Sequence, residues 1–262
     1  MKKVLIVGKK SFTGSHLYNF LKDFFYVKIF SFKDLAYKNL DYFDYIINCS
    51  IHPNYTRLKY NKKFDIDLKI IGMLKKNYSK YIFLNTRKIY KQKFNIKENF
   101  YFNPIDNYSK NKLRTEKQLI KIMQSRLVSL RISNILGRRN FLKNKRAHNL
   151  FLDNFIKYRK YGKTIRFNDC FKDFITIDYF NKVIFKIIKK NITGIYNLSL
   201  GKKIYLSEIV RWLDPHFSKK IQFSYKDRNK YSFTLNNNKL VKKIKIKISK
   251  NQVRNFCKKI FK

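Results

Sequence analysis

The chain has 262 residues, a net charge of +45 and a hydrophobic content of 44%. This length and apolar content predict a folded protein with a sizeable core. The sequence contains no run of 18 apolar residues, and a short apolar stretch without a cleavage-site pattern follows Met1-Lys2-Lys3. We therefore expect neither a membrane span nor a signal peptide, and we place the protein in the cytoplasm. The three cysteines are far apart without metal-type spacing, so we expect neither a disulfide nor a metal site: Cys49, Cys170 and Cys257.

The positive charge favours a nucleic-acid partner, but its distribution argues against one. Lysines are spread over the whole length instead of gathering in one arm or stripe, and only two alanines and seven glycines occur. This skew is typical of an AT-rich coding sequence. We interpret the charge as mainly compositional and expect no nucleic-acid partner. A non-catalytic nucleotide-binding or nucleic-acid-associated protein that retains the fold is the alternative.

The start of the chain predicts a strand, a tight turn and a helix. Val4 to Val7 form a continuous apolar run, as in a central parallel strand, and the segment from Gly8 to Gly14 precedes a helical stripe of apolar residues. Such a turn directs backbone N–H groups and a helix N-terminus at a pyrophosphate, so we predict a dinucleotide-binding loop with Gly8, Ser11, Phe12 and Gly14. Ser11 occupies the middle position of a GxxGxxG pattern, where it would weaken binding if a positive φ were required.

The second predicted strand, Val27 to Phe30, should end at the adenosine ribose of the cofactor. A carboxylate there would favour NAD, whereas this chain has Ser31 and Lys33. Lys33 matches the 2′-phosphate of NADP better, although Asp34 is close. We expect NADP or NAD, with a preference for NADP.

Further apolar strands alternate with helical segments. They cover 45–48, 81–84 and 127–130. This alternation predicts an α/β fold with a Rossmann-like, doubly wound parallel sheet, in which ligands lie at the carboxyl ends of strands. Gly8, Ser31, Thr86 and Asn134 all fall at such ends.

The segment from about 106 to 125 predicts an amphipathic helix that carries Tyr108 and Lys112 on one face. An ammonium on that face can stabilise a phenolate and lower a tyrosine pKa that is otherwise near 10. Tyr108 is therefore a candidate proton donor and acceptor near neutral pH.

Together these segments resemble the extended short-chain dehydrogenase/reductase family, in particular its sugar-nucleotide epimerases and reductases. The motifs that carry the resemblance follow one another in the family's order: Gly8-x-x-Ser11-x-x-Gly14, Thr86-x-x-x-Tyr90, Tyr108-x-x-x-Lys112, Leu130-Arg131-x-x-Asn134-x-x-Gly137, Lys172-Asp173-Phe174-Ile175-x-Ile177-Asp178 and Gly194-Ile195-Tyr196-Asn197-Leu198. The resemblance covers nearly the whole chain.

The resemblance implies a mechanism. Tyr108 would exchange a proton with a sugar oxygen while a nicotinamide exchanges a hydride, and Lys112 would lower the Tyr108 pKa and hold the nicotinamide ribose. Thr86 would hydrogen-bond the same sugar oxygen, and Asn134 would lie on the diphosphate side of a nucleotide-sugar substrate. The resemblance also implies a homodimer through the helix that carries Tyr108.

The sequence departs from the family at two places. Its 4,6-dehydratases have Asp-Glu directly after the catalytic threonine, where this chain has Arg87 and Lys88, so we expect a 4-epimerase or a 4-keto reductase. The chain is also short for the family. We predict an NAD(P)-binding domain from 1–137 and 182–201, and a small substrate-binding lobe from 138–181 and 202–262.

Overall fold

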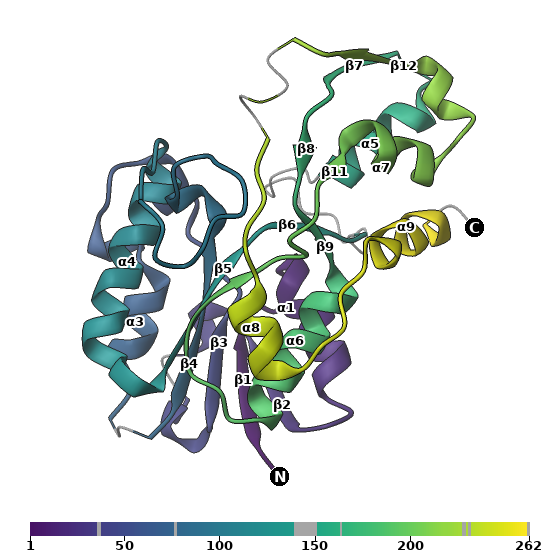
Figure 1. Cartoon of the computed structure of the whole chain (residues 1–262). Helices are drawn as coiled ribbons and strands as arrows, with labels where there is room; N and C mark the ends of the chain where they lie inside the picture. Colours follow the sequence, from purple (N-terminus) through teal and green to yellow (C-terminus); the bar gives the residue numbers. More distant parts are fainter. Residues whose placement is uncertain are drawn as a thin grey trace.

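The computed structural model describes residues 1–35, 38–75, 78–138, 151–162, 164–226, 229 and 232–260. A six-stranded parallel sheet with the order β10-β5-β4-β3-β1-β2 forms its centre (Figure 1). Its strands are β1 (Lys3–Val7), β2 (Tyr26–Phe30), β3 (Tyr45–Asn48), β4 (Lys80–Thr86), β5 (Leu127–Ile132) and β10 (Gly194–Leu198). This confirms the predicted α/β fold. β4 is longer than predicted, because Thr86 is still paired with Ile132.

Helices cover both faces of the sheet. α1 (Phe12–Leu21) and α6 (Ile177–Lys189) pack on one face, while α3 (Ile66–Gly72) and α4 (Asn107–Met123) pack on the other (Figure 1). Side chains alternate along β1, so that Val4 and Ile6 join the first core while Leu5 and Val7 join the second. A strand buried on both faces has to be apolar at every position, which explains the continuous run that predicted it.

Smaller elements lie beyond the carboxyl ends of the strands (Figure 1). They are β6 (Asn134–Leu136) paired with β9 (Phe174–Thr176), β7 (Ile165–Asn168) with β12 (Ile221–Ser224), β8 (Phe171–Lys172) with β11 (Ile204–Tyr205), and the helices α5 (Phe151–Lys160), α7 (Leu206–Leu213) and α9 (Lys250–Lys259). Two short helices complete the chain: α2 (Pro53–Arg57), which packs on α4, and α8 (Asn238–Ile244), which lies beside α6.

The predicted division into a cofactor domain and a substrate lobe stays a prediction. Its boundary between residues 181 and 182 falls inside α6, and residues 139–150 of the predicted lobe lie outside the described part of the chain. Within the described residues, no helix combines the length and the apolar character needed to cross a membrane.

One buried carboxylate joins the sheet to the segments above it. Asp173, fully buried, accepts backbone N–H groups from Leu200 at 2.8 Å, Gly201 at 3.0 Å and Leu235 at 3.1 Å. It therefore fixes the chain after β10 and the segment before α8 against the start of β9.

Candidate active site

The turn after β1 has a backbone geometry typical of anion-binding loops, and hydrogen bonds of the Ser11 hydroxyl hold this turn together. Gly8 has φ +123°, a region that favours glycine, whereas Ser11 has φ −82° and is the N-cap of α1. The Ser11 hydroxyl donates to the Gly8 carbonyl at 2.8 Å and accepts the Gly14 N–H at 2.9 Å. A Cβ on Gly14 would lie 2.5 Å from the Gly8 carbonyl oxygen. Serine thus fits the middle position of the motif without strain, whereas positions 8 and 14 require glycine.

Two donors in this loop face outward from the helix end. Among the described residues, no acceptor pairs with the backbone N–H groups of Phe12 and Thr13, the first two positions of α1. Unpaired N–H groups and the positive end of the helix dipole attract phosphate oxygens. The loop can therefore present these donors to an anion, and the prediction that Gly8, Ser11, Phe12 and Gly14 bind the pyrophosphate of a dinucleotide stays a prediction.

The turn after β2 carries a positively and a negatively charged side chain where the adenosine ribose of the cofactor is expected. A 3-10 turn over Phe32–Leu35 follows Ser31, and the Asp34 N–H donates to the Ser31 carbonyl at 3.0 Å. Lys33 and Asp34 are both exposed on this turn. The turn can therefore present a cation or a carboxylate to the cofactor.

The buried face of α4 is mostly polar, which is unusual for a helix packed on a central sheet. Its buried residues are Ser109, Asn111, Lys112, Thr115, Glu116, Leu119 and Met123. Tyr108 is half-buried at the start of the helix, and none of the described residues hydrogen-bonds to its hydroxyl. Ile120, although apolar, is 38% exposed. Hydrogen bonds and ion pairs, and not apolar packing alone, therefore hold this face of α4.

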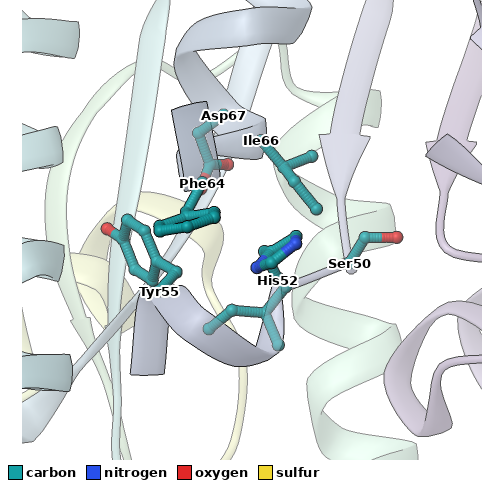
Figure 2. Close-up of a pocket in the computed structure, with 7 residues that line it drawn as sticks. Ser50, His52, Tyr55, Phe64, Ile66 and Asp67 are labelled. Carbon is teal, nitrogen blue, oxygen red and sulfur yellow. The ribbon is translucent and has the colours of Figure 1, made fainter. Parts of the chain in front are cut away.

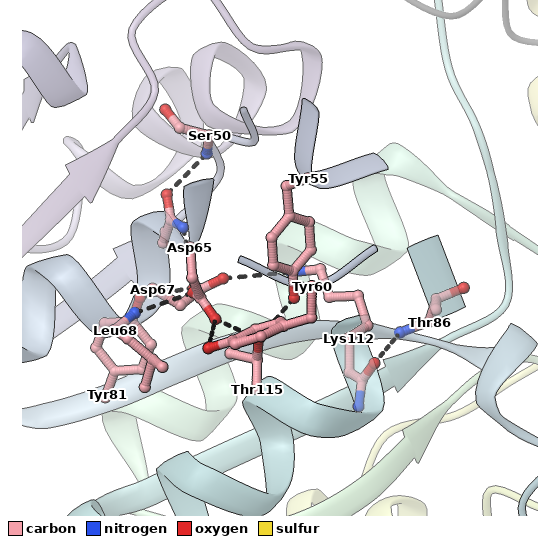
Figure 3. A network of polar contacts seen from close by, with 12 residues as sticks. Ser50, Tyr55, Tyr60, Asp65, Asp67, Leu68, Tyr81, Thr86, Lys112 and Thr115 are labelled. Atoms are coloured by element: carbon pink, nitrogen blue, oxygen red, sulfur yellow. Dashed lines mark hydrogen bonds and ion pairs between the residues drawn. The ribbon is translucent and has the colours of Figure 1, made fainter. Parts of the chain in front are cut away.

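The buried Lys112 ammonium has a partner that the sequence did not reveal. Its Nζ lies 3.4 Å from Oδ2 of Asp67 on α3 (Figure 3). The same Nζ lies 4.4 Å from the ring centre of Phe83. Asp67 also accepts the Asn48 amide at 2.9 Å and the Tyr81 hydroxyl at 2.7 Å. Burial, together with the Asp67 charge, raises the pKa of Tyr81, which therefore stays a donor. Asp67 thus anchors Lys112 while it is itself held by two neutral donors.

A second buried acid lies beside this pair. Asp65 is the N-cap of α3 and accepts the Leu68 N–H at 3.1 Å and the hydroxyls of Thr115 and Tyr60 (Figure 3). Burial raises its pKa. The only sequence signal for these acids is their place before an apolar helical stretch, in a chain with 16 Asp and Glu.

An ion pair ties the end of β4 to the start of α4. Thr86 ends β4, and its Oγ accepts the Lys88 N–H at 3.3 Å, which leaves the hydroxyl hydrogen free to donate. The Lys88 ammonium lies 2.9 Å from Asp106, the N-cap of α4, which accepts the Ser109 N–H at 2.8 Å. Burial alone would raise the pKa of Asp106, but the bonds from Ser109 and Lys88 lower it. Thr86 is thereby held near the turn that carries Tyr108.

Three buried polar atoms at this edge of the sheet have no partner among the described residues. They are the side-chain Nδ2 of Asn85, Oγ of Ser133 and Nδ2 of Asn134. Asn85 precedes Thr86, and the other two follow β5. Because buried polar groups are nearly always hydrogen-bonded, these atoms are available to bond a ligand or water at the carboxyl edge.

A small hollow adjoins the Asp67 network on the side of β3. Ser50, Ile51, His52, Tyr55, Phe64, Ile66 and Asp67 line it (Figure 2). The His52 ring stacks on Phe64 with ring centres 4.7 Å apart, and its Nδ1 accepts the Asn54 N–H at 3.1 Å. The hollow continues the site from Lys112 toward the end of β3.

The predicted residues thus lie along one edge of the sheet. The glycine loop is at the end of β1, Ser31 and Lys33 follow β2, Thr86 ends β4, and Asn134 follows β5. Tyr108 and Lys112 lie on α4, which packs against β4 and against the turn that follows it. Their individual roles stay predictions.

The model of the family described as NAD dependent epimerase/dehydratase matches residues 4–199. No curated protein sequence matches the chain. Among solved structures, UDP-N-acetylglucosamine 4-epimerase from Methanobrevibacter ruminantium, in complex with UDP-N-acetylmuramic acid, is similar at 19% identity and a TM-score of 0.77, covering 98% of this chain and 96% of that one.

Two further structures have the same fold. The dTDP-glucose 4,6-dehydratase from Bacillus anthracis, in complex with NAD, has 14% identity and a TM-score of 0.76, covering 98% and 95%. RMD from Pseudomonas aeruginosa, complexed with NADPH, has 16% identity and a TM-score of 0.71, covering 98% of each chain.

Proposed function

Because the chain belongs to the NAD dependent epimerase/dehydratase family, we propose that it is an NAD(P)-dependent enzyme that acts on a nucleotide-activated sugar as a 4-epimerase or a 4-keto reductase. One observation carries this proposal. α4 turns a polar face inward, where it buries the Lys112 ammonium one helical turn from the Tyr108 hydroxyl, which has no hydrogen-bond partner among the described residues. Burying a lysine is costly, and a helix that only packed would have an apolar residue there.

The residues of the first loop fit a nicotinamide dinucleotide. The free N–H groups of Phe12 and Thr13 would hold the pyrophosphate, and the turn after Ser31 would hold the adenosine ribose. When bound, the nicotinamide ring accepts or supplies a hydride. The structural neighbours that bind NAD and NADPH support a nicotinamide cofactor. Lys33 favours NADP by electrostatics.

In this proposal Tyr108 gives a proton to the sugar oxygen or takes one from it. Thr86 donates its hydroxyl hydrogen to the same oxygen, and Lys112 leaves Asp67 to hold the nicotinamide ribose. The free Nδ2 of Asn134 would bind the diphosphate side of the substrate. Arg87 and Lys88 follow Thr86, so the turn offers neither a carboxylic acid nor a carboxylate for dehydration.

The first test is cofactor binding followed by turnover. NADPH or NADH titrated into the protein should bind with a dissociation constant in the micromolar range, seen as enhanced nicotinamide fluorescence. Mass spectrometry of the ligand that co-purifies should identify a nucleotide or a nucleotide sugar. If neither cofactor binds and the protein is retained on DNA in a salt-sensitive way, the enzyme proposal is wrong and the nucleic-acid alternative stands.

A further inference from the structure

Among the described residues, Arg87 has no acidic partner of its own. It follows Thr86 in the 3-10 turn Arg87–Ile89, is half-buried, and its guanidinium lies 3.6 Å from the ring centre of the fully buried Phe233. None of the residues that the structure describes makes a hydrogen bond or an ion pair with this guanidinium. Burial lowers the pKa of Arg87 to about 10, which reflects the cost of holding the charge there.

The charges of Arg87 and Lys88 both act on that of a second lysine, Lys172. Of the two lysines, only Lys88 forms an ion pair with an acid among the described residues. Lys88 is paired with Asp106 at 2.9 Å. Lys172 on β8 is half-buried, and burial lowers its pKa, with the charges of Arg87 and Lys88 lowering it further. Asp106 is the carboxylate that acts on Arg87, and it is already engaged by Lys88. Two cations therefore share this place without a counter-ion from the described chain.

The position of Arg87 beside Thr86 suggests that the anion it binds is part of the bound sugar. Consecutive Cα atoms are about 3.8 Å apart, so Arg87 starts beside Thr86, the residue proposed to hold the reacting sugar oxygen. The neighbouring free groups of Asn85, Ser133 and Asn134 are neutral and suit hydroxyl or phosphate oxygens. A planar guanidinium stacked on a ring is pre-organised to bind a carboxylate through two parallel bonds.

We propose that Arg87 binds a carboxylate carried by the sugar ring, so that the substrate is a nucleotide-activated acidic sugar. This inference rests on the proposed function. It adds the class of sugar, which neither Tyr108 nor Lys112 determines. The diphosphate, the other source of negative charge in such a substrate, would then bind elsewhere along the edge.

Calorimetric titration of matched ligand pairs tests this. The probes are UDP-glucose with UDP-glucuronate, GDP-mannose with GDP-mannuronate, and UDP and GDP alone, each with saturating NADPH. The wild type should bind the acidic member of at least one pair about tenfold more tightly, the effect of one charge-assisted bidentate contact. Arg87→Met keeps the packing on Phe233 and should remove this preference while leaving the free diphosphate within about twofold. Lys88→Met, the matched control, should keep the preference.

The outcomes separate this inference from the proposed function. Equal affinity for neutral and acidic sugars in the wild type overturns the inference alone. An equal loss of UDP or GDP and acidic-sugar affinity in Arg87→Met shows that the guanidinium binds the diphosphate, and also overturns it. No binding of any of the six ligands to a protein that binds NADPH overturns the inference for UDP- and GDP-activated sugars, whereas no binding of NADPH or NADH contradicts the proposed function itself. As a folding check, Arg87→Met should melt at or above the wild-type temperature, because it removes an unpaired charge.

Discussion

α4 contributes to two buried ion pairs that differ in their construction. Glu116 meets Arg131 of β5 through two contacts, Nε to Oε1 at 3.0 Å and Nη2 to Oε2 at 2.8 Å, with side chains 1% and 4% exposed. One helical turn earlier, Lys112 meets Asp67 through a single contact of 3.4 Å. Burial alone would lower the pKa of Arg131, but the bonds and charge of Glu116 raise it.

The difference between the two ion pairs indicates a structural role for one part of α4 and a functional role for another. The planar fork of arginine fixes Glu116 in one arrangement, and Ser129 and Tyr90 bond to the same pair. A lysine on a flexible stem held by one long contact can change partner at little cost. The tight pair therefore holds α4 on the sheet, and under the proposed function the loose pair would keep an ammonium available for the cofactor.

The largest effect should come from breaking the tight pair. Glu116→Gln keeps the shape of the side chain but leaves the Arg131 charge buried and unpaired, so it should lower the free energy of unfolding by about 3–5 kcal/mol. Urea denaturation measures this. Lys88→Ala breaks the exposed Lys88–Asp106 pair and should cost less than about 1 kcal/mol. Equal losses in the two variants would contradict a special role for the buried fork.

Asp173 extends the comparison of Glu116 and Asp67, because its partners are backbone N–H groups and not a cation. Burial raises the pKa of Asp173 from 3.8 to about 7, although the N–H groups of Leu235, Leu200 and Gly201 lower it. The folded state therefore keeps a proton that the unfolded chain releases. Stability from this group is present below about pH 4 and is lost as the pH rises through about 7.

Between pH 4.5 and 8 the wild type should thus lose about 2–4 kcal/mol relative to Asp173→Asn, which cannot titrate. Urea denaturation of both proteins at each pH measures the difference. Parallel stability curves would show that Asp173 is ionised throughout and that its three backbone donors outweigh burial.

The loose pair should respond to ligand instead of to denaturant. If Lys112 leaves Asp67 to hold the cofactor, Asp67→Asn removes a competitor and should tighten NADPH binding by about tenfold. Fluorescence titration measures this. Lys112→Met should weaken binding, and adding Asp67→Asn to it should bring no gain. Weaker binding in Asp67→Asn alone would mean that Asp67 positions Lys112 and does not compete for it.

Periodicity and motif order predicted the sheet and the edge along which the site residues lie, because a strand buried on two faces leaves an apolar run and a helix leaves a stripe. The same reasoning failed for Asp67 and Arg87. Each depends on a partner far away in the chain, Lys112 and Phe233 respectively, and spacing carries no signal for such contacts. Ser11 has φ −82°, so the positive φ at which serine would weaken cofactor binding does not occur, and the sequence does not reveal this angle.

The smallest effect concerns the choice of cofactor, on the exposed turn after β2. Lys33 can pair with a 2′-phosphate in water, so we expect an about tenfold preference for NADP over NAD. Lys33→Ala should reduce it to about twofold, measured as the ratio of two dissociation constants. Asp34→Asn should leave NADP binding unchanged. If the protein binds NAD at least as tightly as NADP, and Lys33→Ala changes neither affinity, another residue determines which ribose is bound.

The central claim is that Tyr108 moves the proton at the sugar oxygen while Lys112 and the glycine loop hold the cofactor. Tyr108→Phe removes one hydroxyl that has no partner among the described residues, so the fold and cofactor affinity should stay within about twofold. Turnover of the nucleotide sugar identified from the co-purified ligand should fall by roughly 10²–10⁴. Wild-type turnover in Tyr108→Phe, with unchanged cofactor binding, would show that another group is the acid and would contradict this account.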